Sequence, residues 1–179
     1  MFDTILKLGR NGDEQALMRL YDLCCNVVYN ASYNIVLNEQ DAEEIAHDAI
    51  LAAFSLLRDF KGNESCFVAW VKKIAVNKSI DKYRRDSRKP LLVDVEEFKE
   101  KIEDDDDETY SIEQVKAALA GLSEGYRVVI TLRLLEEMEY EDIANRLNIN
   151  ESSVRSQYSR GIAKIREVLR VNLNNSYEY

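Results

Sequence analysis

The sequence predicts an all-α protein in which two small helical domains are joined by an acidic flexible linker, the second domain containing a helix-turn-helix. Three observations support this fold class. The 179-residue chain has six Gly and one Pro against 46% hydrophobic and 32% charged residues, a composition typical of soluble helical proteins. Apolar residues recur at the three-and-four spacing of a helix on both sides of a middle stretch. That middle stretch is rich in Asp and Glu, which favours a linker.

Residues 1–89 are expected to form the first domain from a series of helices. An apolar stripe at helical spacing predicts the first of them and comprises Leu17, Leu20, Tyr21, Cys24, Val27, Val28 and Ala31. A second helix is expected from about Asp41, because Asp41 and Glu44 have the spacing of a capping box. Its stripe continues through Ile45, Ala49, Ala52, Leu56 and Phe60. A break at residues 61–63 precedes a third helix from about Ser65, with Phe67, Trp70, Ile74 and Ala75 on one side.

Residues 90–112 are expected to be the linker. Pro90 ends helical continuity, and the 23 residues hold two Lys and ten acidic residues, a net charge of -8 within a total of -9. Like charges repel and favour an extended, flexible chain. The run from Asp104 to Glu108 has two interpretations, a solvated spacer or a mimic of nucleic acid that shields basic faces.

Residues 113–179 are expected to form the second domain. Ser111 and Gln114 have capping-box spacing at the start of its first helix, and 123–135 is the next. The pattern then predicts helices over 140–147 and 151–171, separated by a short break at 148–150. Two helices joined by a tight turn are the helix-turn-helix arrangement.

The last predicted helix has an apolar face and a basic face. Val154, Tyr158, Ile162, Ile165 and Leu169 share one side and are expected to pack inward. The other side is small or basic and is expected to read duplex DNA through Ser152, Ser153, Arg155, Ser156, Ser159, Arg160, Ala163 and Lys164. Five basic residues and one acidic residue give residues 152–170 a charge of +4. The alternative is the solvated face of an ordinary helical hairpin.

A second basic stretch, residues 72–89, has eight Lys or Arg and two Asp, a net charge of +6. Phe67 and Trp70 precede it in the sequence, and Tyr83 lies within it. A basic helix bordered by aromatic rings suits a melted DNA strand, because cations follow the phosphates and rings stack on bases. Phe67 and Trp70 also fit the alternative of an ordinary helical core.

Two stretches resemble domains of extracytoplasmic-function sigma factors, members of the sigma-70 family. DAEEIAHDAILAAFSLLRDFKGNESCFVAWVKKIAVNKSIDKYRR (41–85) resembles their domain 2, and LSEGYRVVITLRLLEEMEYEDIANRLNINESSVRSQYSRGIAKIREVL (122–169) resembles their domain 4. The resemblance implies a transcription initiation factor that binds core RNA polymerase and directs it to minus-35 and minus-10 promoter elements. The implied partners are core RNA polymerase, promoter DNA as duplex and melted strand, and an anti-sigma factor.

The resemblance also implies site residues. Polymerase would be bound by Glu44, Asp48, Leu51 and Ser55. The minus-10 element would be bound by Trp70, by the base-capturing loop Asn63, Glu64 and Ser65, and along the strand by Asn77, Lys78, Asp81, Arg84 and Arg85. The minus-35 element would be bound by the basic face of the last helix. Three positions depart from the family pattern: Ser123 replaces a frequent Pro, Gln157 a frequent basic residue and Gly161 a frequent Ala. A stand-alone helix-turn-helix repressor or activator is the alternative function.

Enzymatic and cofactor chemistry is not expected. His47 is the only histidine, and no set of nucleophile, base and orienting group is recognisable. Cys24, Cys25 and Cys66 contain no CxxC pair, so neither disulfides nor a metal site are predicted, and buried inert thiols are expected. The absence of a long apolar run or a signal-like start predicts a cytoplasmic protein with no direct membrane insertion.

Overall fold

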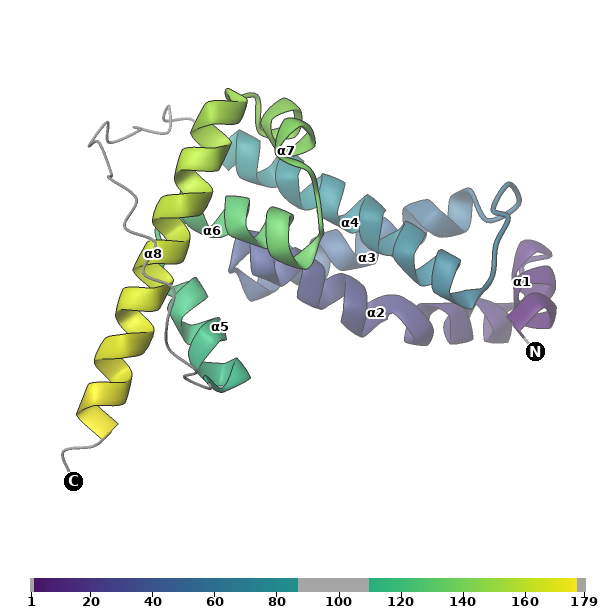
Figure 1. Cartoon of the computed structure of the whole chain (residues 1–179). Helices are drawn as coiled ribbons and strands as arrows, with labels where there is room; N and C mark the ends of the chain where they lie inside the picture. Colours follow the sequence, from purple (N-terminus) through teal and green to yellow (C-terminus); the bar gives the residue numbers. More distant parts are fainter. Residues whose placement is uncertain (1, 87–109, 177–179) are drawn as a thin grey trace. The chain divides into compact units, whose positions relative to one another are not determined.

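The computed structural model describes residues 2–86 and 110–176, with side chains up to residue 170 (Figure 1). Within these ranges the regular structure is entirely helical. The chain divides into two compact units, Met1–Arg88 and Lys89–Tyr179. The predicted all-α class with two helical domains is therefore confirmed. Most of the predicted linker, including its acidic run, lies outside the described residues, and the domain boundaries at 89 and 113 remain predictions.

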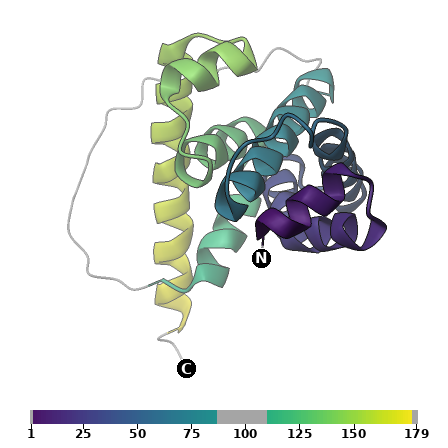
Figure 2. The same cartoon turned by 90° about the vertical axis from the view of Figure 1, so that its right-hand side faces the viewer.

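The first unit consists of α1 (Phe2–Arg10), α2 (Glu14–Val36), α3 (Glu39–Ser55) and α4 (Glu64–Asp86). The three longer helices surround a common core, in which Leu20, Cys24, Val28, Ile50, Phe67 and Val71 are fully buried. The short helix α1 lies at the end of this bundle where the chain turns from α3 into α4 (Figures 1 and 2). Its Leu6 and Gly9 are buried.

Three details of the first unit differ from the sequence prediction. The second predicted helix begins at Glu39, two residues before Asp41, because the side chain of Asn38 accepts a hydrogen bond from the Asp41 backbone amide at 2.9 Å and is the N-cap. This helix ends at Ser55, so the residues after it no longer follow the helical spacing of the predicted apolar stripe. Leu56 is 51% exposed, and Leu57 takes the buried position. Val27, expected in the first stripe, is 42% exposed.

The second unit consists of α5 (Ile112–Ala120), α6 (Glu124–Ile130), the π-helical turn η1 (Thr131–Leu135), α7 (Tyr140–Leu147) and α8 (Glu151–Ser176). The predicted capping box is confirmed, since Ser111 and Gln114 exchange side-chain-to-backbone hydrogen bonds. The predicted helix over 140–147 is also confirmed, and Asn148 ends it with a positive φ of 56°. The last helix begins at the predicted Glu151 but continues five residues beyond 171.

Gly161 lies where α8 packs against α6. A Cβ atom at this position would lie 2.5 Å from Cδ1 of Ile130 and 3.2 Å from Cβ of Tyr126. The glycine that departs from the family pattern therefore permits a close approach of two helices.

None of the helices in the described parts of the chain combines the length and apolar content needed to cross a bilayer.

Candidate nucleic-acid interface

The helix-turn-helix is formed by α7, the turn at 148–150 and α8. Val154, Ile165 and Leu169 are buried, as predicted for the inward side of α8, and Tyr158 and Ile162 are half-buried. Buried contacts along this side fix how α8 rotates about its axis. The packing therefore decides which side chains are left for a ligand.

The side chains predicted to read duplex DNA are all at least partly accessible. Ser152, Arg155 and Lys164 are exposed, and Ser153, Ser156, Ser159, Arg160 and Ala163 are half-buried. They supply hydroxyl groups and cations, which suit base edges and phosphates. The structure thus brings the predicted set together on α8, and its contact with DNA remains a prediction.

Arg155 is held by neighbours that the sequence analysis did not single out. Its guanidinium donates to Oε1 of Glu151, one helical turn earlier, and lies 4.5 Å from the centre of the Tyr140 ring. Arg133 lies 4.9 Å from the same ring and pairs with Glu139 at 3.1 Å. Cation–π contacts and ion pairs restrict a long side chain. The i,i+4 spacing of Glu151 and Arg155 was the only sequence signal for this cluster.

Two residues of α8, Gln157 and Lys164, make contacts that the helical pattern alone did not indicate. Gln157 is 8% exposed and shares the inward side with Val154, so its replacement of a frequent basic residue does not change the outward side. Its Oε1 has no hydrogen-bond partner among the described residues. Lys164 lies with Nζ 5.6 Å from the centre of the Tyr126 ring, at the edge of α6.

In the first unit, α3 presents the side chains predicted to bind polymerase as one exposed stripe. Glu44, Asp48, Leu51 and Ser55 follow four-and-three spacing, and all are exposed. Leu51 is 52% exposed although it is a large apolar residue. The stripe therefore combines carboxylates with an apolar contact.

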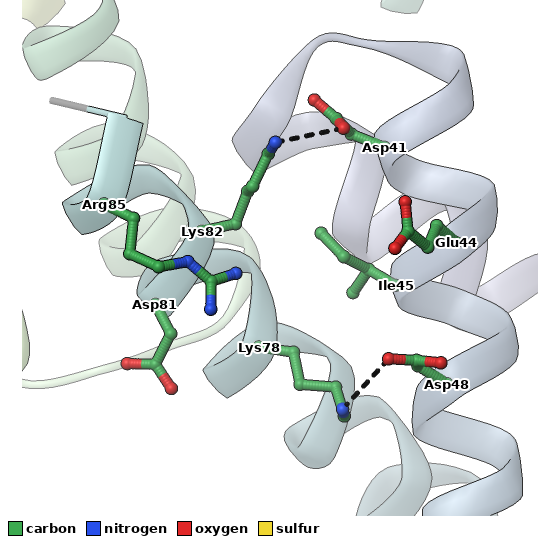
Figure 3. A pocket seen from close by; sticks show the side chains of 8 residues that line it. All are labelled: Asp41, Glu44, Ile45, Asp48, Lys78, Asp81, Lys82 and Arg85. Carbon is green, nitrogen blue, oxygen red and sulfur yellow. Dashed lines mark hydrogen bonds and ion pairs between the residues drawn. The ribbon is translucent and has the colours of Figure 1, made fainter.

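A polar groove with a volume of about 290 Å³ is lined by side chains of α3 and α4 (Figure 3). It is lined by Asp41, Glu44, Ile45, Asp48, Lys78, Asp81, Lys82 and Arg85. Residues predicted for polymerase and residues predicted for the minus-10 strand thus face each other across one groove.

Ion pairs cross the groove. Nζ of Lys78 lies 3.4 Å from Asp48, and Nζ of Lys82 lies 3.2 Å from Asp41. Hydrogen bonds to Asp41 and Asp86 raise the pKa of Lys82 above its usual value. The Arg85 guanidinium points into the groove in Figure 3 and forms no ion pair with the described residues.

The remaining predicted residues of this unit lie along α4. Arg84 is exposed, with its Nη1 3.9 Å from Asp81, which is also exposed, and Asn77 is half-buried. They share the helix with Lys78 and Arg85. One helix therefore holds all the residues predicted to follow the strand.

Asn63, Glu64 and Ser65 are all exposed, but only Asn63 belongs to the loop, because α4 begins at Glu64, one residue before the predicted start. Oδ1 of Asn63 accepts a hydrogen bond from the Cys66 amide at 2.9 Å, so this side chain also caps α4. The sequence analysis did not predict that second role.

Three aromatic residues on either side of this loop in the sequence, Phe60, Phe67 and Trp70, form a packed cluster. The Phe67 ring is fully buried, which confirms its core alternative. Trp70 is half-buried and stacks on Phe60, with ring centres 5.1 Å apart and planes at 20°. One side of the indole is thus covered by protein.

The thiols differ in accessibility. Cys24 is buried, and burial raises its pKa to about 12. Cys25 is half-buried and Cys66 is exposed, so the expectation of three buried thiols was wrong.

The single His47 is exposed on α3, 6.0 Å from the Tyr21 ring. No group of three or more potential ligands for a metal occurs in the described residues.

Two family models match the chain. The model described as Sigma-70 region 2 matches residues 20–89, and that described as Sigma-70, region 4 matches residues 112–165. They cover 70 and 54 residues of 179, and neither includes α1.

Relatives that match over most of their own length are sigma factors as well. The chain is 27% identical over 185 residues to the ECF RNA polymerase sigma factor SigW of Bacillus subtilis, covering 95% of this chain and 97% of the relative. It is 26% identical to the RNA polymerase sigma-H factor of Pseudomonas aeruginosa, covering 89% of each. A solved structure of the sigma factor RpoE with the anti-sigma factor NepR from Bartonella quintana matches weakly, at 20% identity, 88% of this chain, 96% of that chain and a TM-score of 0.49.

The match to region 2 contradicts the alternative of a stand-alone repressor or activator, which a helix-turn-helix alone would have allowed. Both family models and the relatives, which match over most of their own length, agree: this chain belongs to the extracytoplasmic-function sigma factors of the sigma-70 family, promoter-specific initiation factors of RNA polymerase.

Proposed function

We propose that the two units share promoter recognition, with residues 1–89 binding core polymerase and the melted minus-10 strand and residues 113–179 binding the minus-35 duplex. The observation that supports this division is that each unit has its own accessible set of cations, on α4 and on α8. Sigma factors are non-catalytic, so the two units act by binding alone.

The α3 stripe is the proposed polymerase contact. An exposed apolar side chain flanked by carboxylates suits a partner surface that is apolar with basic residues around it. Leu51 supplies the apolar contact, and Glu44 and Asp48 supply the charges. Ser55 completes the stripe on the next turn.

The minus-10 strand is proposed to run from the exposed loop along α4. Opening DNA costs about 1.4 kcal/mol of stacking per base-pair step, so captured bases need compensating contacts. Asn63, Glu64 and Ser65 offer hydrogen-bonding groups to an extruded base, and the partly exposed Trp70 adds aromatic surface. Lys78 and Arg85 offer cations to the phosphates.

The outward face of α8 is proposed to enter the major groove at minus 35. Serine side chains let the helix approach the base edges, and Arg155 and Arg160 supply guanidinium groups for guanine or phosphate. Tyr140 and Glu151 hold Arg155 in a restricted position before DNA arrives.

Paired variants of the holoenzyme test the division. Arg155→Ala should weaken binding to duplex minus-35 DNA about tenfold and leave binding to single-stranded minus-10 DNA within about twofold. Asn63→Ala should have the opposite pattern. The controls are Lys116→Ala, which also removes a positive charge from the second unit, and Asn26→Ala, which also removes a side-chain amide from the first; both positions are exposed. If both variants weaken the same DNA, the division is wrong.

The family further suggests that an anti-sigma factor binds this protein and covers one or both DNA-binding faces. The protein is proposed to act in the cytoplasm, where polymerase and promoters are found. Addition of such a partner should weaken the binding of promoter DNA, and Asp48→Lys should weaken polymerase binding in a pull-down.

A further inference from the structure

The turn that precedes the residues proposed to capture a minus-10 base is hydrogen-bonded to the side chain of one residue of α1. Arg10, the last residue of α1, donates from Nε to the Leu57 carbonyl at 3.2 Å and from Nη2 to the Phe60 carbonyl at 2.5 Å. Both carbonyls belong to the turn between α3 and α4, where helical hydrogen bonds have ended. Such carbonyls need other partners when they are removed from water.

The chemistry of this contact favours arginine. A guanidinium is planar and has five N–H donors in a fixed geometry, so it can bridge two carbonyls three residues apart. A lysine has one nitrogen at the end of a flexible chain and would not reproduce the bridge.

The packing of α1 makes Arg10 a fixed anchor. Leu6 is 3% exposed, and a Cβ atom at Gly9 would lie 3.2 Å from side-chain atoms of both Leu20 and Leu57. The Phe2 ring lies 6.1 Å from Phe67. The helix is thus seated on the same core that supports the loop.

The turn that Arg10 holds connects to the loop through Phe60. The Phe60 ring stacks on Trp70 at 5.1 Å and meets the edge of Phe67 at 5.4 Å. Asn63 follows only three residues later and caps α4. A shift of the Phe60 backbone would therefore move the loop relative to the aromatic cluster.

We propose that Arg10 is a positioning residue for minus-10 recognition: by holding the Leu57 and Phe60 carbonyls, it sets the position of residues 63–65, the end of the loop and the first residues of α4. The inference rests on the proposed base-capturing role of that loop. It assigns a part in promoter recognition to α1, which lies before the residues that match region 2.

The test uses the full-length protein in holoenzyme and three variants of α1: Arg10→Ala, Arg10→Lys and Lys7→Ala. Lys7 is exposed on the same helix, so its variant removes a charge without touching the loop. The probes are a fluorescent single strand with the minus-10 sequence of a promoter recovered by selection, the same strand with one base changed, and a minus-35 duplex. In the free protein, Trp70 reports the aromatic cluster by its emission, because it is the only tryptophan of this chain.

Arg10→Ala should weaken minus-10 strand binding about tenfold, reduce discrimination against the changed base and shift the Trp70 emission. Arg10→Lys, which keeps the charge, should retain only part of the binding. Lys7→Ala and all minus-35 binding should remain within about twofold. Since Arg10→Ala could lower stability, binding is measured below its unfolding temperature, and Arg10→Lys gives an independent result.

Normal minus-10 binding and discrimination by folded Arg10→Ala would overturn the inference, as would an Arg10→Lys variant that behaves like the unchanged protein, because charge alone would then suffice. Asn63→Ala distinguishes a failure of the role of Arg10 from a failure of the base-capturing role of the loop. If Asn63→Ala weakens strand binding and Arg10→Ala does not, only the role of Arg10 fails. If Asn63→Ala has no effect, the base-capturing role of the loop fails and the inference fails with it.

Discussion

Gly161→Ala should destabilise the second unit, because the added methyl group would lie 2.5 Å from Cδ1 of Ile130 and 3.2 Å from Cβ of Tyr126. Overpacking of this kind costs about 1–3 kcal/mol. Replacing a glycine within a helix by alanine returns about 1 kcal/mol of helix propensity. The net loss should therefore be about 1 kcal/mol.

The shortest contact of the added methyl group is with one atom, Cδ1 of Ile130, so a second substitution that removes this atom should relieve the clash. Ile130→Val deletes Cδ1 and by itself should cost about 1 kcal/mol. In the Ile130→Val background, Gly161→Ala should be neutral or stabilising, which gives a coupling energy of about 1 kcal/mol or more between the two positions.

Urea unfolding followed by far-ultraviolet circular dichroism measures these effects. With a slope of about 1 kcal/mol per molar urea for a small unit, Gly161→Ala should lower the midpoint of the second unit by about 1 M. Fluorescence of Trp70, which belongs to the first unit, is the internal control and should keep its midpoint. An equal effect of Gly161→Ala in both backgrounds would refute the packing argument.

Four further results are expected. Asp48→Asn should cost less than about 1 kcal/mol of stability, because its ion pair is exposed, yet weaken polymerase capture in a pull-down; unchanged capture would argue against the α3 stripe. Tyr140→Leu should weaken minus-35 duplex binding severalfold by releasing Arg155, a result checked by anisotropy. Arg155→Lys, which keeps the charge, should not keep full duplex binding. A thiol reagent should modify Cys66 in the folded protein and Cys24 only after unfolding, and equal rates would contradict the burial. Because burial raises the folded-state pKa of Cys24 from 9.0 to about 12, the unfolded chain loses this proton first, so stability should fall as pH rises from about 9 towards 12.

Strong local signals predicted the helix-turn-helix closely. The apolar period of α8 is long, and Asn148 and Asn150 interrupt the helical pattern, so both helices and the inward side of α8 followed from the sequence. The capping box at Ser111 was visible for the same reason, since its two residues are three apart. The residues of the α3 stripe were implied by the resemblance to sigma factors, and the structure shows that they are exposed on one helix.

Features that depend on tertiary contacts could not be predicted this way. Arg10 reaches carbonyls 47 and 50 residues away, and no local pattern marks such a partner. Tyr140 meets Arg155 only because α7 and α8 fold against each other. Gln157 was placed correctly on α8, but its burial depends on helix rotation set by packing. Leu56 was misplaced because the helix ended before the apolar pattern did.

The central claim is that this chain directs core polymerase through two separate promoter elements. Transcription by core polymerase on a library of random promoters, with and without the protein, tests it most directly. The account predicts new start sites that share two elements at a fixed spacing, with Asn63→Ala relaxing the nearer element and Arg155→Ala the farther one. Tight duplex binding by the protein alone, with no polymerase capture and no new start sites, would contradict the account.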